Sequence, residues 1–200
     1  MRQLIFASRN KGKIEEVTHI MKESNIQVLS LLGLEPAPEI IESGVTFEEN
    51  AKIKCKVIFD EFRVPIIGDD SGLSVDQLNG RPGVYSARYA GEHATDNENN
   101  NKLLFELSQF PEPHNAKFIC SAVYYDGKNW LASSGEIKGR IIKLPKGSNG
   151  FGYDPLFVPD GYKQTTAELS LYDKNKISHR AIAFNQLKKI IINLWSLYEK

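Results

Sequence analysis

Residues 4–32, LIFASRNKGKIEEVTHIMKESNIQVLSLL, decide the fold class of this chain. The apolar run at residues 4–7 has the length of a short buried strand, and a polar, glycine-containing stretch follows it at residues 8–13. The next apolar residues recur at helical spacing: Ile14, Val17, Ile20 and Met21. A second apolar run at residues 26–32 completes the order strand, loop, helix, strand, which is typical of an α/β unit.

The rest of the chain extends this architecture. Further helices are predicted over residues 46–62, 96–107 and 177–197. Further strands are predicted over residues 65–68, 117–125 and 130–137. Thr46 with Glu49 fits a capping box, and Asp126-Gly127 marks a hairpin turn between the last two strands. Because a hairpin and parallel units coexist, we expect a mixed sheet flanked by helices.

Length and composition fit a single domain over residues 1–200, or a domain with a small lobe. The 25 Lys and Arg residues balance 25 Asp and Glu residues, which argues against a surface built for nucleic acid. The two cysteines lie in apolar contexts and favour buried free thiols in a reducing compartment. No apolar run reaches the length of a secretory signal or a membrane span. We therefore expect a cytoplasmic protein with no membrane partner.

Four polar clusters interrupt the apolar pattern. The first, residues 8–13, precedes a helix whose free N–H groups favour an anion, and Lys11 and Lys13 add positive charge. It is not a Walker A loop, because Ile14 replaces the required Ser or Thr. Both phosphate binding and a solvent-exposed loop with its lysines in water fit this cluster.

The second cluster, residues 39–51, carries four carboxylates, some of which are explained as charges at a helix N-terminus.

The third cluster, Asp69-Asp70-Ser71-Gly72, places two adjacent acids after a predicted buried strand and before a turn. Neighbouring carboxylates repel unless a cation or hydrogen bonds offset them. Mg²⁺ commonly takes one or two carboxylates plus substrate phosphates, and a carboxylate can also deprotonate a water. An Asx-turn with exposed acids is the structural alternative.

The fourth cluster lies near the C-terminus. Residues 150–155 alternate glycines with aromatic rings, which suits a planar ligand or an aromatic turn packed on the core. Residues 174–180 bring Lys174, Lys176, His179 and Arg180 to the predicted start of the last helix. Because cations there oppose the helix dipole, they suggest a bound anion. For His179, a structural role and a role in the site are equally consistent with the sequence.

Together these clusters have the parts of a nucleoside triphosphate site: cations for phosphates, acids for Mg²⁺ and a ring for the base. Two other function classes stay open. A non-catalytic nucleotide-binding regulator would bind nucleotide and release no pyrophosphate. A nucleic-acid-binding module would lose affinity steeply with salt, and the neutral net charge disfavours it.

Six motifs, in order, carry a resemblance to a known family: residues 8–13, 46–51, 69–73, 81–89, 150–155 and 178–180. On these motifs the sequence resembles the inosine/xanthosine triphosphate pyrophosphatases. The resemblance implies an α/β fold with an elongated mixed central sheet flanked by helices, and two lobes with a substrate cleft between them. It also implies a homodimer and Mg²⁺-dependent hydrolysis of a small-molecule nucleoside triphosphate to monophosphate and pyrophosphate.

The resemblance also assigns roles to residues. Asp70 is implied as proton acceptor and metal ligand. The implied substrate-binding residues are Ser8, Arg9, Asn10, Lys11, Gly12, Lys13, Ser71, Phe151, Gly152, Tyr153, Asp154, Lys174, His179 and Arg180. For selectivity, we expect His179, Arg180 and backbone N–H groups near Phe151 to donate to a 6-oxo purine. Many members carry two glutamates where this chain reads Ile41-Glu42. Glu42 is therefore the second expected metal ligand, and the alternative is an ion held by Asp70, water and phosphates alone.

Overall fold

The opening α/β unit forms as predicted in the structure, a computed structural model that describes residues 2–24, 26–34 and 38–198. It consists of β1 (Arg2–Phe6), α1 (Lys11–Met21) and β2 (Ile26–Ser30). The two strands pair in parallel, with Leu4 opposite Val28. A helix between two parallel strands is the crossover that parallel pairing requires.

The next two helices lie where the sequence predicts them. α2 (Phe47–Phe62) starts after Thr46, whose side chain accepts a hydrogen bond from the Glu49 N–H while the Glu49 carboxylate accepts from the Thr46 N–H. The predicted capping box is therefore confirmed. α3 (Asp96–Leu107) has the predicted bounds and its own capping box at Thr95.

Six strands form one mixed sheet in the order β2-β1-β3-β4-β5-β6. The remaining strands are β3 (Ile66–Val75), β4 (His114–Tyr125), β5 (Trp130–Ile141) and β6 (Phe157–Pro159). β1 pairs in parallel with β3, whereas β5 pairs antiparallel with β6. The predicted mixed sheet flanked by helices is confirmed.

The chain divides into two compact units built from interleaved segments. Unit 1 comprises Met1–Asp70, Cys120–Gly135 and Arg180–Lys200. Unit 2 comprises Ser71–Ile119 and Glu136–His179. Each unit has its own apolar core.

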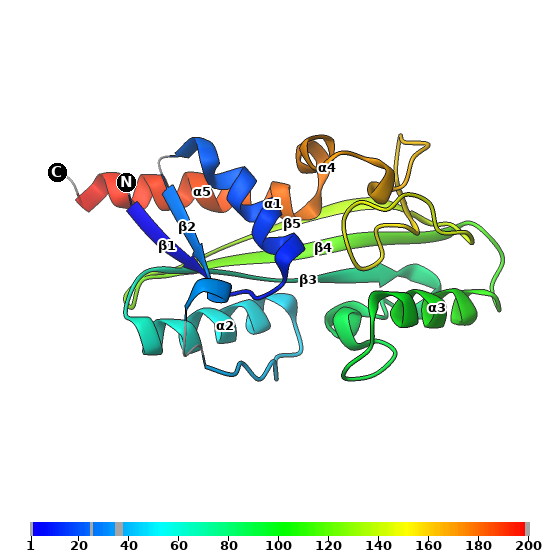
Figure 1. Ribbon diagram of the computed structural model, residues 1–200, viewed down its shortest axis with the longest axis horizontal. Coiled ribbons are helices and arrows are strands. Elements are labelled where there is room, and N and C mark those ends of the chain that lie inside the picture. Colours follow the sequence, from blue (N-terminus) through cyan, green and yellow to red (C-terminus); the bar gives the residue numbers. More distant parts are fainter. Residues whose placement is uncertain (1, 25, 35–37, 199–200) are drawn as a thin grey trace. The chain divides into compact units, whose positions relative to one another are not determined.

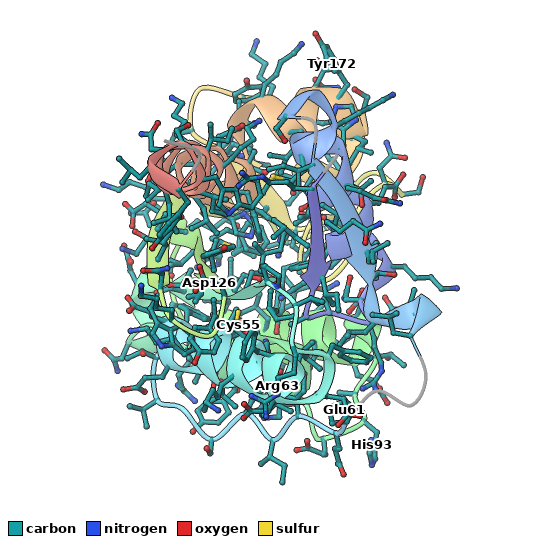
Figure 2. All side chains as sticks on the ribbon, turned by 90° about the vertical axis from the view of Figure 1, so that its left-hand side faces the viewer. Cys55, Glu61, Arg63, His93, Asp126 and Tyr172 are labelled. Atoms are coloured by element: carbon teal, nitrogen blue, oxygen red, sulfur yellow. The ribbon has the colours of Figure 1, made fainter. Side chains whose placement is uncertain are left out.

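In unit 1, helices cover both faces of the strands: α1 and α5 (His179–Tyr198) lie on one side and α2 lies on the other (Figure 1). Phe6 packs edge-on against Phe184 in the core beneath α5. Its neighbour Ile5 enters the core beneath α2, because successive strand residues point to opposite faces. Cys55 on α2 lies in this second core, where its thiol donates to the Val123 carbonyl at 3.6 Å (Figure 2).

In unit 2, the apolar side of α3 packs on the strands through Leu103 and Leu107, in a core that includes Leu73, Phe118 and Tyr153. Both cysteines of the chain are buried free thiols, as predicted. Over the described ranges of the chain, no helix combines the length and apolar character that a membrane crossing requires.

The prediction that the strand ends at residue 68, with the two acids after it and then a turn, is wrong. β3 continues through Asp69 and Asp70 to Val75, so both acids lie inside a strand. They are 1% and 5% exposed, and each is tolerated there because cationic and polar side chains contact it from the adjacent helices.

The prediction for the start of the last helix is correct for His179 and Arg180, which begin α5, and wrong for the two lysines. Lys174 and Lys176 belong to a separate short helix, α4 (Leu171–Ile177), and lie in its last turn. Ser178, with φ −66° and ψ 149°, is extended and separates α4 from α5. Cations in a last helical turn are favourable with the dipole, so the argument that these lysines oppose one does not hold.

Candidate active site

Lys54 on α2 lies between two carboxylates of unit 1. Its Nζ is 2.9 Å from Asp70 Oδ1 and 3.0 Å from Glu42 Oε1, and it also donates to the Asp69 carbonyl at 3.2 Å. The Lys54 and Asp70 side chains are only 9% and 8% exposed, so water screens this pair little. The structure thus brings the two predicted metal ligands together around a lysine that the sequence analysis missed.

Asn50 links Asp70 to the loop before α2. Its Nδ2 donates to Asp70 Oδ2 at 3.1 Å, and its Oδ1 accepts from the Gly44 N–H at 2.8 Å. A Cβ on Gly44 would lie 2.7 Å from that oxygen, so this close approach requires a glycine. One buried amide therefore holds both Asp70 and the loop that carries Glu42.

The sequence does contain a signal for these two missed residues. Asn50 and Lys54 are four residues apart on α2, and each directly precedes a residue of the apolar stripe, Ala51 or Cys55. Residues four apart share a helix face. A polar pair at that spacing beside a buried stripe indicates that the face meets a polar partner.

Asp69 makes a different set of contacts. Its Oδ2 lies 3.2 Å from Lys13 Nζ and accepts from Arg180 Nε at 3.1 Å. Arg180 is 1% exposed, and its Nη1 lies 2.5 Å from Glu16 Oε2. The structure therefore places Arg180, a predicted substrate residue, in a buried chain of ion pairs that fixes Asp69 and Lys13.

The adjacent acids Asp69 and Asp70 have opposite pKa shifts. Burial raises the pKa of Asp70 above its ordinary value, and the opposing effect of Lys54 and Lys13 does not cancel it. Burial also acts on Asp69, but Lys13, Arg180 and Lys54 outweigh it and lower the Asp69 pKa. Burial lowers the pKa of Lys54, and the carboxylates around it more than compensate, so the net shift is upward. Asp70 is accordingly the better proton acceptor of the two.

The predicted phosphate loop connects β1 to α1. Asn10 caps the helix, its Oδ1 accepting from the Lys13 N–H at 3.0 Å, and Ser8 Oγ accepts from the Asn10 N–H at 3.2 Å. No acidic residue lies in the first turn of α1, while Arg9 and Lys11 are exposed. Gly12 is half-buried within the first turn. This helix start is electropositive, and free N–H groups at such a position favour an anion.

Asp154 organises the aromatic turn in unit 2. Its carboxylate accepts from the Phe151 N–H at 2.9 Å, from Thr166 Oγ1 at 2.8 Å and from Lys174 Nζ at 2.5 Å. The Lys174 Nζ also lies 4.9 Å from the centre of the Phe151 ring. A Cβ on Gly150 would lie 2.1 Å from Asp154 Oδ2, so the turn closes only with glycine there. Three predicted site residues are thus in contact within unit 2.

The other predicted residues of unit 2 have varied surroundings. Tyr153 is 4% exposed and donates to the Ser86 carbonyl at 2.9 Å, so it belongs to the core. Phe151 is half-buried, as is Ser71, which follows Asp70 in β3. The His179 ring is stacked on Phe118, with centroids 4.9 Å apart and an interplanar angle of 12°.

Two of the backbone N–H groups expected to donate to a base already have acceptors within unit 2. The Phe151 N–H donates to Asp154, and the Gly152 N–H donates to Asp96 Oδ2 at 2.7 Å. Both donors are therefore used within unit 2. Sequence alone does not reveal this, because Asp96 lies 56 residues away from Gly152.

Across the described ranges, no three His, Cys, Asp or Glu side chains form a metal-binding group. Glu42 and Asp70 nevertheless offer hard oxygen atoms on either side of one ammonium group. Mg²⁺ typically takes one or two carboxylates and completes its coordination with water and phosphate oxygens. The donor set therefore fits an ion shared with a phosphorylated ligand and does not form an all-protein cage.

A family model described as the Ham1 family matches residues 4–190 of this chain. Relatives with nearly full-length matches carry the name dITP/XTP pyrophosphatase. The protein of Bacillus licheniformis is 47% identical over 193 residues, which cover 96% of this chain and 98% of the relative. The protein of Oceanobacillus iheyensis is 46% identical over 192 residues, which cover 94% and 98%.

Solved structures agree with this relationship. A HAM1 protein from Coxiella burnetii superposes with a TM-score of 0.86 at 36% identity, covering 96% of this chain and 100% of that one. The residues matched by the family model, 4–190, include Asp70 and Lys54 in unit 1 and Asp154 and Lys174 in unit 2.

Proposed function

Because the chain belongs to the Ham1 family, we propose that it is a pyrophosphatase of deaminated purine nucleoside triphosphates. It converts ITP, dITP and XTP to the monophosphate and pyrophosphate, which keeps these nucleotides out of DNA and RNA. The observation that carries the proposal is the ion-paired group of Glu42, Lys54 and Asp70, in a chain whose relatives are named dITP/XTP pyrophosphatase.

Asp70 accepts the proton of the attacking water. The raised pKa of Asp70 lies closer to the operating pH, where a general base is most effective. The Asn50 amide and the Lys54 ammonium fix its two oxygen atoms. Fixed donors also mean that the carboxylate needs little reorganisation during the reaction. Asp69, with its lowered pKa, stays ionised and holds Lys13 in place.

Glu42 and Asp70 would hold the Mg²⁺ ion. When bound, the ion neutralises charge on the phosphate oxygens. The loop of Ser8, Arg9, Asn10, Lys11, Gly12 and Lys13 binds the triphosphate through its cations and the N–H groups that begin α1.

Phe151 provides the ring face for the purine, and Lys174 and His179 complete this part of the substrate site. Gly152 and Asp154 shape the turn that carries Phe151, and Tyr153 anchors it in the core. Ser71, which follows Asp70 in the chain, contacts substrate. Arg180 contributes to the site through its buried ion pairs, which fix Asp69. Selectivity comes from His179 as a donor to the 6-oxo group that hypoxanthine and xanthine share and adenine lacks.

The test is to incubate the protein with Mg²⁺ and ITP and to identify the products. We expect inosine monophosphate and pyrophosphate, and lower efficiency on GTP and ATP. Diphosphate plus phosphate would contradict the proposed cleavage, and binding without product would favour a nucleotide-binding regulator. Omitting Mg²⁺, or replacing it with EDTA, should abolish turnover. A rate that stays unchanged without the metal would refute the Mg²⁺ requirement.

Asp70→Asn tests the proton acceptor directly. The amide keeps the shape of the side chain but cannot take a proton, so kcat should fall at least about 1000-fold while KM changes little. Asp60→Asn, at an exposed acid on α2, is the matched control. Near-normal turnover of Asp70→Asn would remove Asp70 from this role.

The proposal also includes a homodimer acting in the cytoplasm. Both features come from the family resemblance, and the buried thiols of Cys55 and Cys120 are compatible with a reducing compartment. Sedimentation analysis should give twice the 22.5 kDa chain mass. A species of chain mass at working concentration would rule out the dimer.

A further inference from the structure

Two side chains of α3 hold the peptide groups on either side of Gly152. The Gly152 N–H donates to Asp96 Oδ2 at 2.7 Å, and the Gly152 carbonyl accepts from Asn100 Nδ2 at 3.0 Å. Asp96 and Asn100 are four residues apart, so they project from the same side of the helix. Gly152 itself has φ +61°, a backbone conformation that other residues adopt only with strain.

The surroundings of these two side chains do not suggest a role in packing. Asp96 is exposed in the first turn of α3, where its charge is favourable with the helix dipole. Asn100 is 6% exposed, and within the described part of the chain its buried Oδ1 has no hydrogen-bond partner. A buried acceptor without a donor costs stability, so packing alone does not explain why position 100 carries an amide.

The turn that these contacts hold carries Phe151. The Phe151 N–H is bonded to Asp154, and the next two peptide groups are bonded to Asp96 and Asn100. Three successive peptide groups around one half-buried ring are thus fixed by side chains. This fixes the position of the ring before any ligand binds, which reduces the ordering cost of binding.

We propose that Asp96 and Asn100 are positioning residues that fix the Phe151 turn for the purine ring. The inference rests on the proposed function, in which Phe151 stacks on the base. Neither residue contacts substrate; each acts through Gly152. Their loss therefore weakens the binding of nucleotides with a purine ring and leaves the chemical step intact.

The test uses Asp96→Ala and Asn100→Leu with two controls on exposed neighbours of the same helix, Asn97→Ala and Asn101→Ala. Each positioning variant should raise KM for ITP about three- to thirtyfold, the effect of losing one such hydrogen bond, with kcat within about twofold of wild type. The controls should match wild type. Asp96→Asn should restore KM, because its amide oxygen accepts from the same N–H.

A purely structural role would give a different pattern. Asn100→Leu loses the hydrogen bond to the Gly152 carbonyl but also removes a buried unpaired acceptor, so the two effects on stability oppose each other and its melting temperature should stay close to that of wild type even though its KM rises. A lower melting temperature with unchanged KM would overturn the inference. So would a KM for Asp96→Ala that equals the KM of Asn97→Ala.

Amide hydrogen exchange separates this inference from the proposed function. Exchange of the Gly152 N–H should accelerate at least about tenfold in Asp96→Ala, without substrate present. Unchanged exchange would overturn the positioning role whatever the enzyme hydrolyses. Wild-type protein that hydrolyses no purine triphosphate would overturn the proposed function, and with it the link from this turn to base affinity.

Discussion

The Lys54 ammonium lies 2.9 Å from Asp70 Oδ1, and both side chains are more than nine-tenths buried. The same ammonium contacts Glu42 at 3.0 Å. Lys54 therefore neutralises two carboxylates that repel each other at close range. Asp70 is also the largest contributor to raising the Lys54 pKa, which keeps this lysine charged despite its burial.

Lys54→Met should lower kcat/KM for ITP at least about 100-fold, because Asp70 loses the charge that fixes its carboxylate. Steady-state kinetics on protein shown to be folded by circular dichroism measure this. Lys52→Met is the control, since Lys52 is half-exposed on α2 and forms an ion pair with the exposed Glu48. Activity of Lys54→Met within tenfold of wild type would show that Lys54 has no part in the reaction.

Glu42→Gln should raise the Mg²⁺ concentration for half-maximal activity about tenfold, since a charged oxygen ligand becomes neutral. A magnesium titration at saturating ITP provides the measurement, and Glu39→Gln, at an exposed acid in the same loop, should behave as wild type. Ile41, which stands where many family members carry a glutamate, is 74% exposed. If Glu42→Gln needs the same Mg²⁺ concentration for half-maximal activity as wild type, the ion is held by Asp70 and substrate, and Glu42 is not a ligand.

Phe118→Leu should tilt His179, because the stacked ring that fixes the imidazole plane is lost. We expect KM for ITP to rise about fivefold, and the ring protons of His179 to shift downfield in NMR spectra as the ring current disappears. Phe157→Leu is the matched control, because Phe157 packs on the same Phe118 ring in the same core. Both variants should lose about 1–3 kcal/mol of stability. If Phe157→Leu raises KM equally, the effect belongs to packing and not to the stack.

The free energy of unfolding should fall as pH drops from about 7 toward 5, in part through His114. Burial lowers the pKa of His114 below 6.5, a shift that Glu112 opposes and Lys143 supports, and His114 Nδ1 lies 2.7 Å from Gln77 Oε1. The unfolded chain therefore binds a proton near pH 6.5 that the folded chain does not, and stability present above that pH is lost below it.

Chemical denaturation at several pH values measures this slope. His114→Gln should flatten it, whereas His93→Gln, at an exposed position, should leave it unchanged. An identical slope in His114→Gln would show that other groups account for the acid sensitivity.

Local sequence was sufficient for most of the helices and strands. The apolar spacing, the Thr46–Glu49 capping box and the hairpin turn at Asp126 are satisfied by near neighbours in the chain, so they are visible without a structure. The motif residues were recognisable for the same reason. The end of β3 was not, because two adjacent acids are typical of a turn unless distant cations permit them to lie in a buried strand.

The sequence by itself therefore determined the α/β class, the family and the motif residues, since these depend on residue type and short-range spacing. Only the tertiary structure decided which partner each charge has. In the structure, Lys54 pairs with Asp70 and Glu42, and Arg180 pairs with Asp69 and Glu16. Asp96 accepts a hydrogen bond from the Gly152 N–H. Those contacts join residues distant in the chain, and burial sets their strength, so no local pattern encodes them.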